Sequence, residues 1–252
     1  AWDGTGLGQD GTLWGGEALI AHNGGWKQFA SVRPFRLPGG EMTARQPWRI
    51  AAALLWSECK DVPLNWNVDS HILLQAWRAG INSPWCSSVG RLFDAASVIL
   101  GLVRETSYDG EAAMRLECAA AGEIDLDSGE WPMTCDEHGV WRSDWQSMLP
   151  MLYESPLTLT QRAQRFHGAL VNVIKSQAHL ARQLFGVRRV GLAGGVFQNA
   201  LLMAGAEEQL LRDGFEVLNS PPVPINDGGL ALGQVLHVSR WGTASFADAN
   251  RE

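Results

Sequence analysis

Three glycine-rich turns set backbone amides beside polar side chains, and these residues are the best suited to bind a ligand. The turns are Asp3-Gly-Thr-Gly, Ala193-Gly-Gly-Val followed by Asn199, and Asn226-Asp-Gly-Gly. Glycine lets a ligand approach main-chain N–H groups closely, and the amides at a helix N-terminus attract anions. The turns therefore favour a phosphate-bearing ligand. None of them matches a Walker A sequence or a G-x-G-x-x-G fingerprint, so neither P-loop nor Rossmann chemistry follows.

Each turn also has a purely structural explanation. Glycines beside helices commonly form C-caps and tight turns. Asp3 suits an Asx-turn and Asp227 suits a helix cap, and the residues alone favour these explanations, but a carboxylate flanked by glycine also leaves room for a divalent cation with water and phosphate oxygens around it. The residues alone leave both explanations open.

Covalent catalysis has no motif in this sequence. The six histidines form no H-x-x-x-H pair, and the four cysteines, at 59, 86, 118 and 135, form no C-x-x-C pair, which argues against a zinc knuckle or a dithiol redox site. No neighbour in the sequence gives the Cys86 thiol an unusual reactivity. We expect no side-chain nucleophile, and reduced, structural cysteines typical of the cytoplasm.

The composition and net charge of the chain exclude some classes of partner. The 252 residues are 46% hydrophobic and 19% charged, which is enough for a sizeable buried core. Acids outnumber bases by 27 to 20, and the net charge of −7 argues against nucleic acid as a partner. The uncharged apolar runs, such as 50–56, are shorter than the roughly 20 residues of a membrane span. We expect a cytoplasmic protein that binds neither membrane nor nucleic acid. Because Ala1 follows no initiator Met or signal segment, we also expect a piece of a longer polypeptide.

The hydrophobic pattern indicates which elements position the turns. Residues 12–22 and 26–35 predict a β-hairpin around Asn23-Gly24, whereas the glycine-rich opening over 3–11 predicts a loop. Apolar spacing then predicts helices over roughly 42–59, 66–79, 88–100, 110–121, 142–153 and 158–185. The stretch 122–141 is rich in acids and has no Lys or Arg between Glu123 and Glu137, which predicts a solvated, mobile loop.

The last quarter of the chain returns to alternating elements. A short buried strand over 189–193 leads through Gly194-Gly195 into a helix over 197–212. A second strand over 215–218 precedes a final helix from Asp227 to about Trp241. This order predicts an α/β core with a helical insertion.

The three turns are part of a longer series of motifs. In order, the series reads Asp3-Gly-Thr-Gly-x-Gly-x-Asp-Gly-Thr-Leu-Trp14-Gly-Gly-Glu17, Leu37-Pro-Gly-Gly40, Pro47-Trp-Arg49, Ser87-Ser88-Val-Gly90-Arg91-Leu-Phe-Asp94, Tyr108-Asp-Gly-Glu111, Gly194-Gly-Val-x-x-Asn199 and Asp227-Gly-Gly-x-x-x-Gly-Gln234. From about residue 1 to 241, the order and spacing of these motifs resemble the carbamoyltransferase domain of HypF-type hydrogenase-maturation proteins.

The resemblance implies one lobe of the sugar kinase, heat-shock and actin-like (ASKHA) fold, with nucleotide and metal bound between two lobes. It implies that residues 1–241 form the C-terminal lobe of the carbamoyltransferase domain. Within it we expect a glycine loop and hairpin (1–40), a mainly helical insertion (41–186) and an α/β nucleotide-binding part (187–241), followed by a flexible tail (242–252). The family's metal-binding H-x-x-x-H pair has no counterpart in this sequence.

The resemblance also implies roles for individual residues. Asp3 and Asp227 resemble the carboxylate ligands of a divalent metal, iron or zinc, whose histidine ligands lie on the absent lobe. The implied nucleotide contacts are Thr5 and Gly6 for phosphates, Gly194, Gly195 and Asn199 for adenosine, and Gly90, Arg91, Asp94 and Glu111 for the remaining nucleotide side. Asp94 is the implied acceptor for a ribose hydroxyl, although its position on a predicted helix also suits a solvated acid that pairs with Arg91.

The implied activity is transfer of a carbamoyl group from carbamoyl adenylate, made from carbamoyl phosphate and ATP, to the C-terminal cysteine of a HypE-type acceptor protein. The upstream lobe and modules of the same protein are the other implied partners. Two alternatives stay open: a small-molecule O-carbamoyltransferase of antibiotic biosynthesis, which shares the domain, and an inactive isolated lobe that binds nucleotide or docks a partner. The motifs at 37–40 and 47–49 favour the maturation type.

Overall fold

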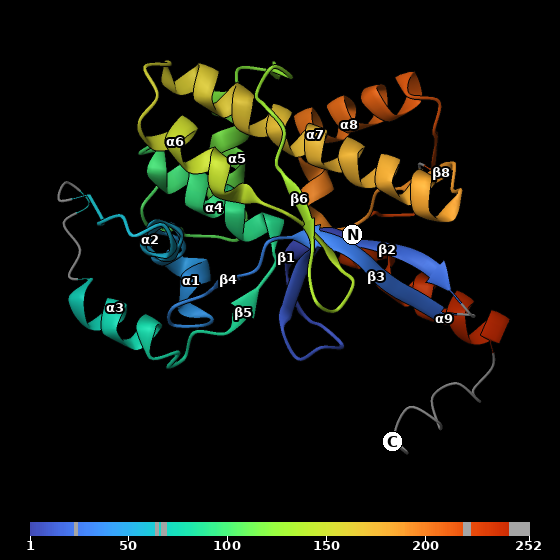
Figure 1. The fold of residues 1–252 in the computed structure, drawn as a ribbon, viewed down its shortest axis with the longest axis horizontal. Helices are drawn as coiled ribbons and strands as arrows, with labels where there is room; N and C mark the ends of the chain where they lie inside the picture. Colours follow the sequence, from blue (N-terminus) through green and yellow to red (C-terminus); the bar gives the residue numbers. More distant parts are fainter. Residues whose placement is uncertain (23–24, 64–65, 67–69, 219–222, 242–252) are drawn as a thin grey trace.

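The computed structural model describes residues 1–22, 25–63, 66, 70–218 and 223–241. A mixed α/β architecture is observed, as the sequence predicts (Figure 1). The turn at Asn23-Gly24 and the tail at 242–252 lie outside the described residues. Within the described part of the chain, no helix is both long and apolar enough to cross a membrane.

A β-hairpin forms the centre of the main sheet. Its strands, β2 (Leu13–His22) and β3 (Gly25–Val32), pair antiparallel, as the sequence predicts. The sheet continues from β3 to β7 (Trp141–Ser143) and β6 (Met133–Cys135), and from β2 to β5 (Trp85–Cys86) and β4 (Phe35–Arg36). A separate parallel pair joins β8 (Arg189–Gly191) and β9 (Glu216–Leu218).

The opening residues form a strand, so the prediction of a loop there was wrong. Strand β1 (Trp2–Leu7) pairs antiparallel with β2, with Trp2 opposite Gly16 and Leu7 opposite Leu13. Glycine-rich sequence reads as loop because glycine weakens an isolated strand. Here the small residues let β1 lie close to its neighbours, which compensates for that weakness.

The helices lie mainly between β4 and β8 in the sequence. They are α1 (Met42–Arg45), α2 (Trp48–Ser57), α3 (His71–Arg78), α4 (Val89–Ile99), α5 (Glu111–Ala119), α6 (Met148–Tyr153), α7 (Leu159–Phe185), α8 (Ala200–Arg212) and α9 (Leu230–Trp241). Local sequence fixes the long helix α7: Thr158 and Gln161 form a capping box at its start, and Gly186 ends it in the left-handed conformation with φ 69°.

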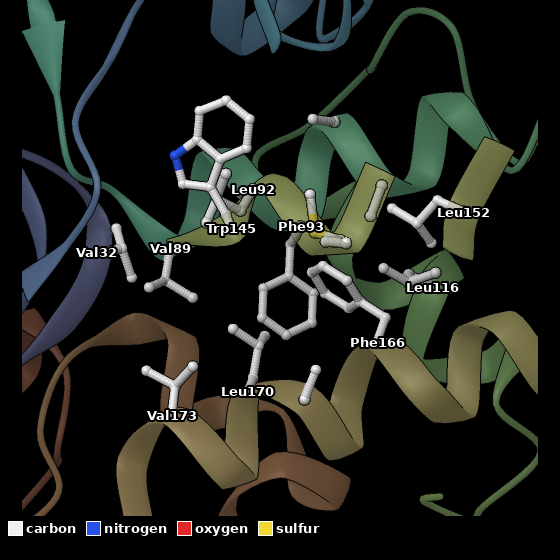
Figure 2. Close-up of a cluster of buried hydrophobic side chains, with 14 of the residues drawn as sticks. Val32, Val89, Leu92, Phe93, Leu116, Trp145, Leu152, Phe166, Leu170 and Val173 are labelled. Atoms are coloured by element: carbon white, nitrogen blue, oxygen red, sulfur yellow. The ribbon is translucent and has the colours of Figure 1, made fainter. Parts of the chain in front are cut away.

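Large apolar side chains from these helices form the core (Figure 2). Phe93 of α4 packs edge-to-face on Phe166 of α7, with ring centroids 5.0 Å apart. Leu92, Leu116, Trp145, Leu152 and Leu170 surround this pair and are fully or almost fully buried. The helical insertion therefore shares one continuous core with the sheet.

Three element predictions need correction. The helix expected over 42–59 is divided into α1 and α2 at Pro47, which cannot continue the hydrogen-bonded ladder. The helix expected over 142–153 begins only at Met148, because 141–143 pairs with β3 as strand β7. Strand β8 was expected to be buried, but Arg189 and Gly191 are exposed.

The acidic stretch 122–141 is docked on α7 rather than solvated throughout. The Asp125 amide donates to the Gln164 carbonyl at 3.2 Å, and the Asn172 Nδ2 atom donates to the Leu126 carbonyl at 3.1 Å. Gly168 makes this close approach possible, because a Cβ atom there would lie 1.9 Å from the Asp125 carbonyl oxygen. Acid content alone did not reveal these backbone contacts.

We predict that Gly168→Ala destabilises the protein although it improves helix propensity. Alanine gains about 1 kcal/mol over glycine in a helix interior, but its Cβ must displace the Asp125 backbone, so we expect a net loss of about 2 kcal/mol. Gly233→Ala in α9 is the matched control, because a Cβ at Gly233 meets no atom within 4 Å. Chemical denaturation of both variants tests this. Equal stability changes for the two variants would contradict this prediction. They would show that the 122–141 segment moves away from the added Cβ without a cost in free energy.

Candidate functional site

One cavity of about 1280 Å³ adjoins the predicted turns. It lies between β2, β8, the end of α7 and the segment 223–230. Its polar lining includes Asp3, Glu17, Gly194, Asn226 and Asp227. The structure thus brings both predicted metal-binding carboxylates, from opposite ends of the chain, to the wall of a single cavity.

Close backbone contacts join the three turns. The Trp2 amide donates to the Ala193 carbonyl at 2.8 Å, and the Gly194 amide donates to the Ile225 carbonyl at 2.6 Å. Gly194 has φ +109°, and a Cβ there would lie 2.0 Å from the Trp2 carbonyl oxygen. A Cβ at Gly195 would lie 2.9 Å from the Oδ1 atom of Asp3. These two positions are restricted to glycine or nearly so, because a strand backbone and a carboxylate occupy the space of a side chain.

The two structural explanations for the aspartates fit the geometry poorly. The cap of the short helix η4 (Asp227–Gly229) is Asn226, whose Oδ1 accepts from the Gly228 amide at 3.1 Å. Asp3 accepts from the adjacent Gly4 amide at 2.8 Å, not from the amide two residues further on that defines an Asx-turn. Both carboxylates therefore retain oxygens for a ligand.

The metal implied by the fold family finds only part of a site here. Two carboxylates are hard donors of the kind that divalent cations accept. Among the residues that the structure describes, however, no three His, Cys, Asp or Glu side chains gather closely enough to hold a metal ion. Asp3 and Asp227 thus fit as two ligands of a site that other groups must complete.

Glu17 also lines the cavity, although the sequence analysis named it only as the end of the first motif and gave it no role. It is buried in β2, where its Oε2 atom accepts from the Gly15 and Gly16 amides at 2.6 and 2.8 Å and its Oε1 atom accepts from the Ser87 hydroxyl. Burial raises its pKa, while these hydrogen bonds act in the opposite direction. The sequence did contain a sign of such a role, because Glu17 is an acid within a predicted strand whose other residues are mostly apolar or glycine.

A second group of predicted residues lies where α4 begins, against β1. The Ser88 hydroxyl donates to the Asp3 carbonyl at 2.8 Å and also caps α4 by accepting from the Arg91 amide. A Cβ at Gly90 would lie 2.9 Å from the Asp3 carbonyl oxygen, so this glycine allows α4 to pack on β1. Thr5 and Gly6 are exposed on the same strand.

Arg91 and Asp94 form the ion pair that their spacing allows, at 2.9 Å, with only 9% of the Asp94 side chain exposed. Burial raises the pKa of Asp94 to about 6, and Asp109 adds to the rise while Arg91 opposes it. A Cβ at Gly4 would lie 3.4 Å from the Arg91 Nη2 atom, which places this pair beside the glycine turn of β1.

Two other predicted nucleotide contacts already have partners within the chain. Glu111 accepts from the Ser107 amide and hydroxyl and pairs with Arg115, and these interactions, led by the amide, lower its pKa. Asn199 caps α8 by accepting from the Leu202 amide at 2.9 Å, and its Nδ2 atom lies 3.0 Å from Nε2 of buried His167. A nucleotide contact at either residue would have to replace these bonds.

The Cys86 thiol is no candidate nucleophile. It is fully buried, its Sγ atom accepts from the Ser88 amide, and burial raises its pKa to about 12. The thiol therefore stays protonated near neutral pH.

Comparison with known proteins places the chain in a family. Residues 1–234 match the family described as "Carbamoyltransferase, Kae1-like Domain, second subdomain". The chain is 34% identical to the "Carbamoyltransferase HypF" of Synechocystis sp., over 94% of this chain and 33% of that protein. It is 35% identical to the "Carbamoyltransferase HypF homolog" of Cupriavidus necator, over 98% of this chain and 66% of that protein. The chain thus spans about a third of the length of the Synechocystis relative.

Solved structures agree with this placement. The chain superposes on a crystal structure of full-length HypF in the phosphate- and nucleotide-bound form with a TM-score of 0.82 and 29% identity, over 95% of this chain and 32% of that chain. For the crystal structure of T. kodakarensis HypF, the TM-score is 0.76 at 26% identity, over 93% of this chain and 32% of that chain. The predicted resemblance and fold class are confirmed, and the chain belongs to the Kae1-like carbamoyltransferase domain family, in its second subdomain.

Proposed function

We propose that this chain is the part of a HypF-type carbamoyltransferase that holds the nucleotide and one side of a metal centre during hydrogenase maturation. The observation that carries the proposal is the meeting of Asp3, Asp227 and the Gly194 turn at one cavity. A nucleotide- and phosphate-bound HypF of the same fold supports it.

The described residues suit separate parts of carbamoyl adenylate. The exposed Thr5–Gly6 segment offers backbone groups for phosphate oxygens, and we assign the adenosine to the glycine turn at 194–195. Asp94, held by Arg91, offers a carboxylate to a ribose hydroxyl. A bound divalent metal would be held by Asp3 and Asp227 and would supply positive charge near the phosphates.

The acceptor must supply the nucleophile, because the Cys86 thiol is buried and protonated. We propose the C-terminal cysteine of a HypE-type protein for this role. Its sulfur forms a C–S bond to the carbamoyl carbon as the bond from that carbon to the phosphate oxygen breaks, and AMP leaves. The thiol proton goes to the departing phosphate or to solvent. The chain's own contribution is to hold the adenylate in place.

The test of the whole activity is a chimera. This chain replaces the matching third of the Synechocystis relative, and ATP cleavage dependent on carbamoyl phosphate is measured. We expect turnover in the chimera and none with this chain alone, because two carboxylates form an incomplete site. Turnover by this chain alone would contradict the division of the site between lobes.

We predict that Asp227→Asn weakens divalent cation binding without affecting the fold. Because Asn226 supplies the cap of η4, the midpoint of thermal unfolding should stay within about 1 °C. Loss of the carboxylate should lower the affinity for Mn²⁺, measured with ATP present, about tenfold or more. Asp127→Asn, at an exposed acid outside the cavity, is the control with the same charge change. Equal Mn²⁺ affinity in both variants would remove Asp227 from the metal site.

We also predict that Asp94 makes stability depend on pH. Its pKa rises from 3.8 in the unfolded chain to about 6 in the folded one, so the folded protein binds the proton more tightly. The charged carboxylate therefore destabilises the fold above pH 6, and this penalty disappears as pH falls toward 4. Relative to Asp94→Asn, the wild-type chain should lose about 1–3 kcal/mol of stability between pH 4 and pH 7. Denaturant titration at both pH values measures this, and a constant difference would contradict it.

A further inference from the structure

Asn199 joins the second glycine turn to the helix that follows it. It ends the short helix η3 (Gly195–Gln198), which begins after Gly194, and its side chain caps α8 by accepting from the Leu202 amide. Its own backbone amide donates to the Val196 carbonyl at 3.1 Å. A change in the position of Asn199 would therefore move the turn to which the adenosine is assigned.

A second residue, His167 of α7, holds the Asn199 side chain. The Nδ2 atom of Asn199 lies 3.0 Å from Nε2 of the imidazole, and the imidazole Nδ1 atom lies 2.8 Å from the Ala163 carbonyl oxygen. The fully buried ring also packs edge-to-face on Phe93 and Phe166, with centroids 5.4 and 6.0 Å away. Because this phenylalanine pair lies in the centre of the core (Figure 2), the imidazole has little freedom to turn.

The partners of these two side chains determine where the protons lie. A carbonyl oxygen only accepts, so the Nδ1 atom of His167 carries the proton that it donates to Ala163. In the neutral ring, Nε2 is then an acceptor. Because Oδ1 of Asn199 accepts from the Leu202 amide, Nδ2 is the atom that faces Nε2 and donates to it. This arrangement satisfies all three hydrogen bonds at once.

The charged form of His167 does not fit this arrangement. Its Nε2–H group would face the Nδ2–H groups of Asn199, and turning the side-chain amide over would place those groups against the Leu202 amide instead. Burial lowers the pKa of His167, although the Ala163 carbonyl and the charge of Glu117 oppose this effect. The ring therefore stays neutral near neutral pH, as the bond from Asn199 requires.

The first turn of α8 has a further partner besides Asn199. The Oε1 atom of Glu117, from α5, accepts from the Ala200 amide at 2.7 Å and from the Leu201 amide at 3.4 Å. These amides keep their partner when the Asn199 side chain moves. Loss of the bond from Asn199 to His167 should therefore disturb the turn before α8 more than α8 itself.

We propose that His167 is a positioning residue for the nucleotide: it holds the Asn199 side chain in one orientation and thereby fixes the turn at 194–198. This role rests on the proposed function, which assigns the adenosine to that turn. Because the His167 ring is fully buried, it acts on the nucleotide through Asn199 and not by contact.

Two amide substitutions at His167 separate the two hydrogen bonds of the ring. In His167→Gln, the longer side chain places an oxygen near the position of Nε2 and keeps an acceptor for Asn199. In His167→Asn, the shorter side chain keeps the donor to Ala163 but leaves Asn199 without its acceptor. Each variant loses one hydrogen bond and the ring contacts with Phe93 and Phe166, so we expect similar losses of unfolding stability.

We predict that the Leu202 amide exchanges about tenfold or more faster in His167→Asn than in His167→Gln, measured on the 252-residue chain. In the chimera with the Synechocystis relative, His167→Asn should raise the KM for ATP about fivefold or more, and His167→Gln about twofold at most. In both variants kcat should change less than KM, because the ring touches no reacting atom. Equal exchange and equal KM in the two variants would overturn the proposal, because only a loss of core packing would then have been shown.

The variant Asn199→Ser breaks the same bond without altering the aromatic core. Serine caps helices about as well as asparagine, but its shorter side chain does not reach His167. We expect the KM for ATP to rise as in His167→Asn. A rise in Asn199→Ser with none in His167→Asn would overturn the proposal and indicate that Asn199 contacts the nucleotide directly.

Failure of the proposed function gives a different result. A wild-type chimera without ATP-dependent turnover would contradict the proposed function, whatever the state of His167. The exchange rates of the Leu202 amide need neither nucleotide nor metal. They decide by themselves whether His167 holds Asn199.

Discussion

The close approach of the Trp2 carbonyl to the backbone of Gly194 determines how the three glycine-rich turns meet at the cavity. With φ +109° and no room for a Cβ, Gly194 lets the first strand approach the turn after β8 at a distance that no other residue permits. The Trp2–Ala193 hydrogen bond then fixes this approach. As a result, Asp3 lies against Gly195, and the Gly194–Ile225 bond draws the Asn226-Asp227 turn to the same wall.

Hydrogen-bond partners separate the site residues into two kinds. Asn199 and Glu111 have their polar atoms engaged by backbone amides and by neighbouring side chains, which is the arrangement expected of groups that stabilise the fold. Asp3 and Asp227 line a cavity and keep carboxylate oxygens for other partners. Asp94 lies between these two kinds. It pairs with Arg91, but burial of its charged carboxylate lowers the stability of the fold. Such a cost is retained more readily where a ligand requires the charge.

The sequence alone predicts the elements whose signals are local. The hairpin β2–β3, the capped helices α4 and α7, and the glycine turn before α8 all follow from caps, turns and periodicity. Elements fixed by distant backbone contacts were not predicted. Strand β1 depends on pairing with β2, and the 122–141 segment depends on a glycine in α7 that admits the Asp125 carbonyl. The motif series indicated Asp3 and Asp227 together, but only the structure shows that they share a cavity.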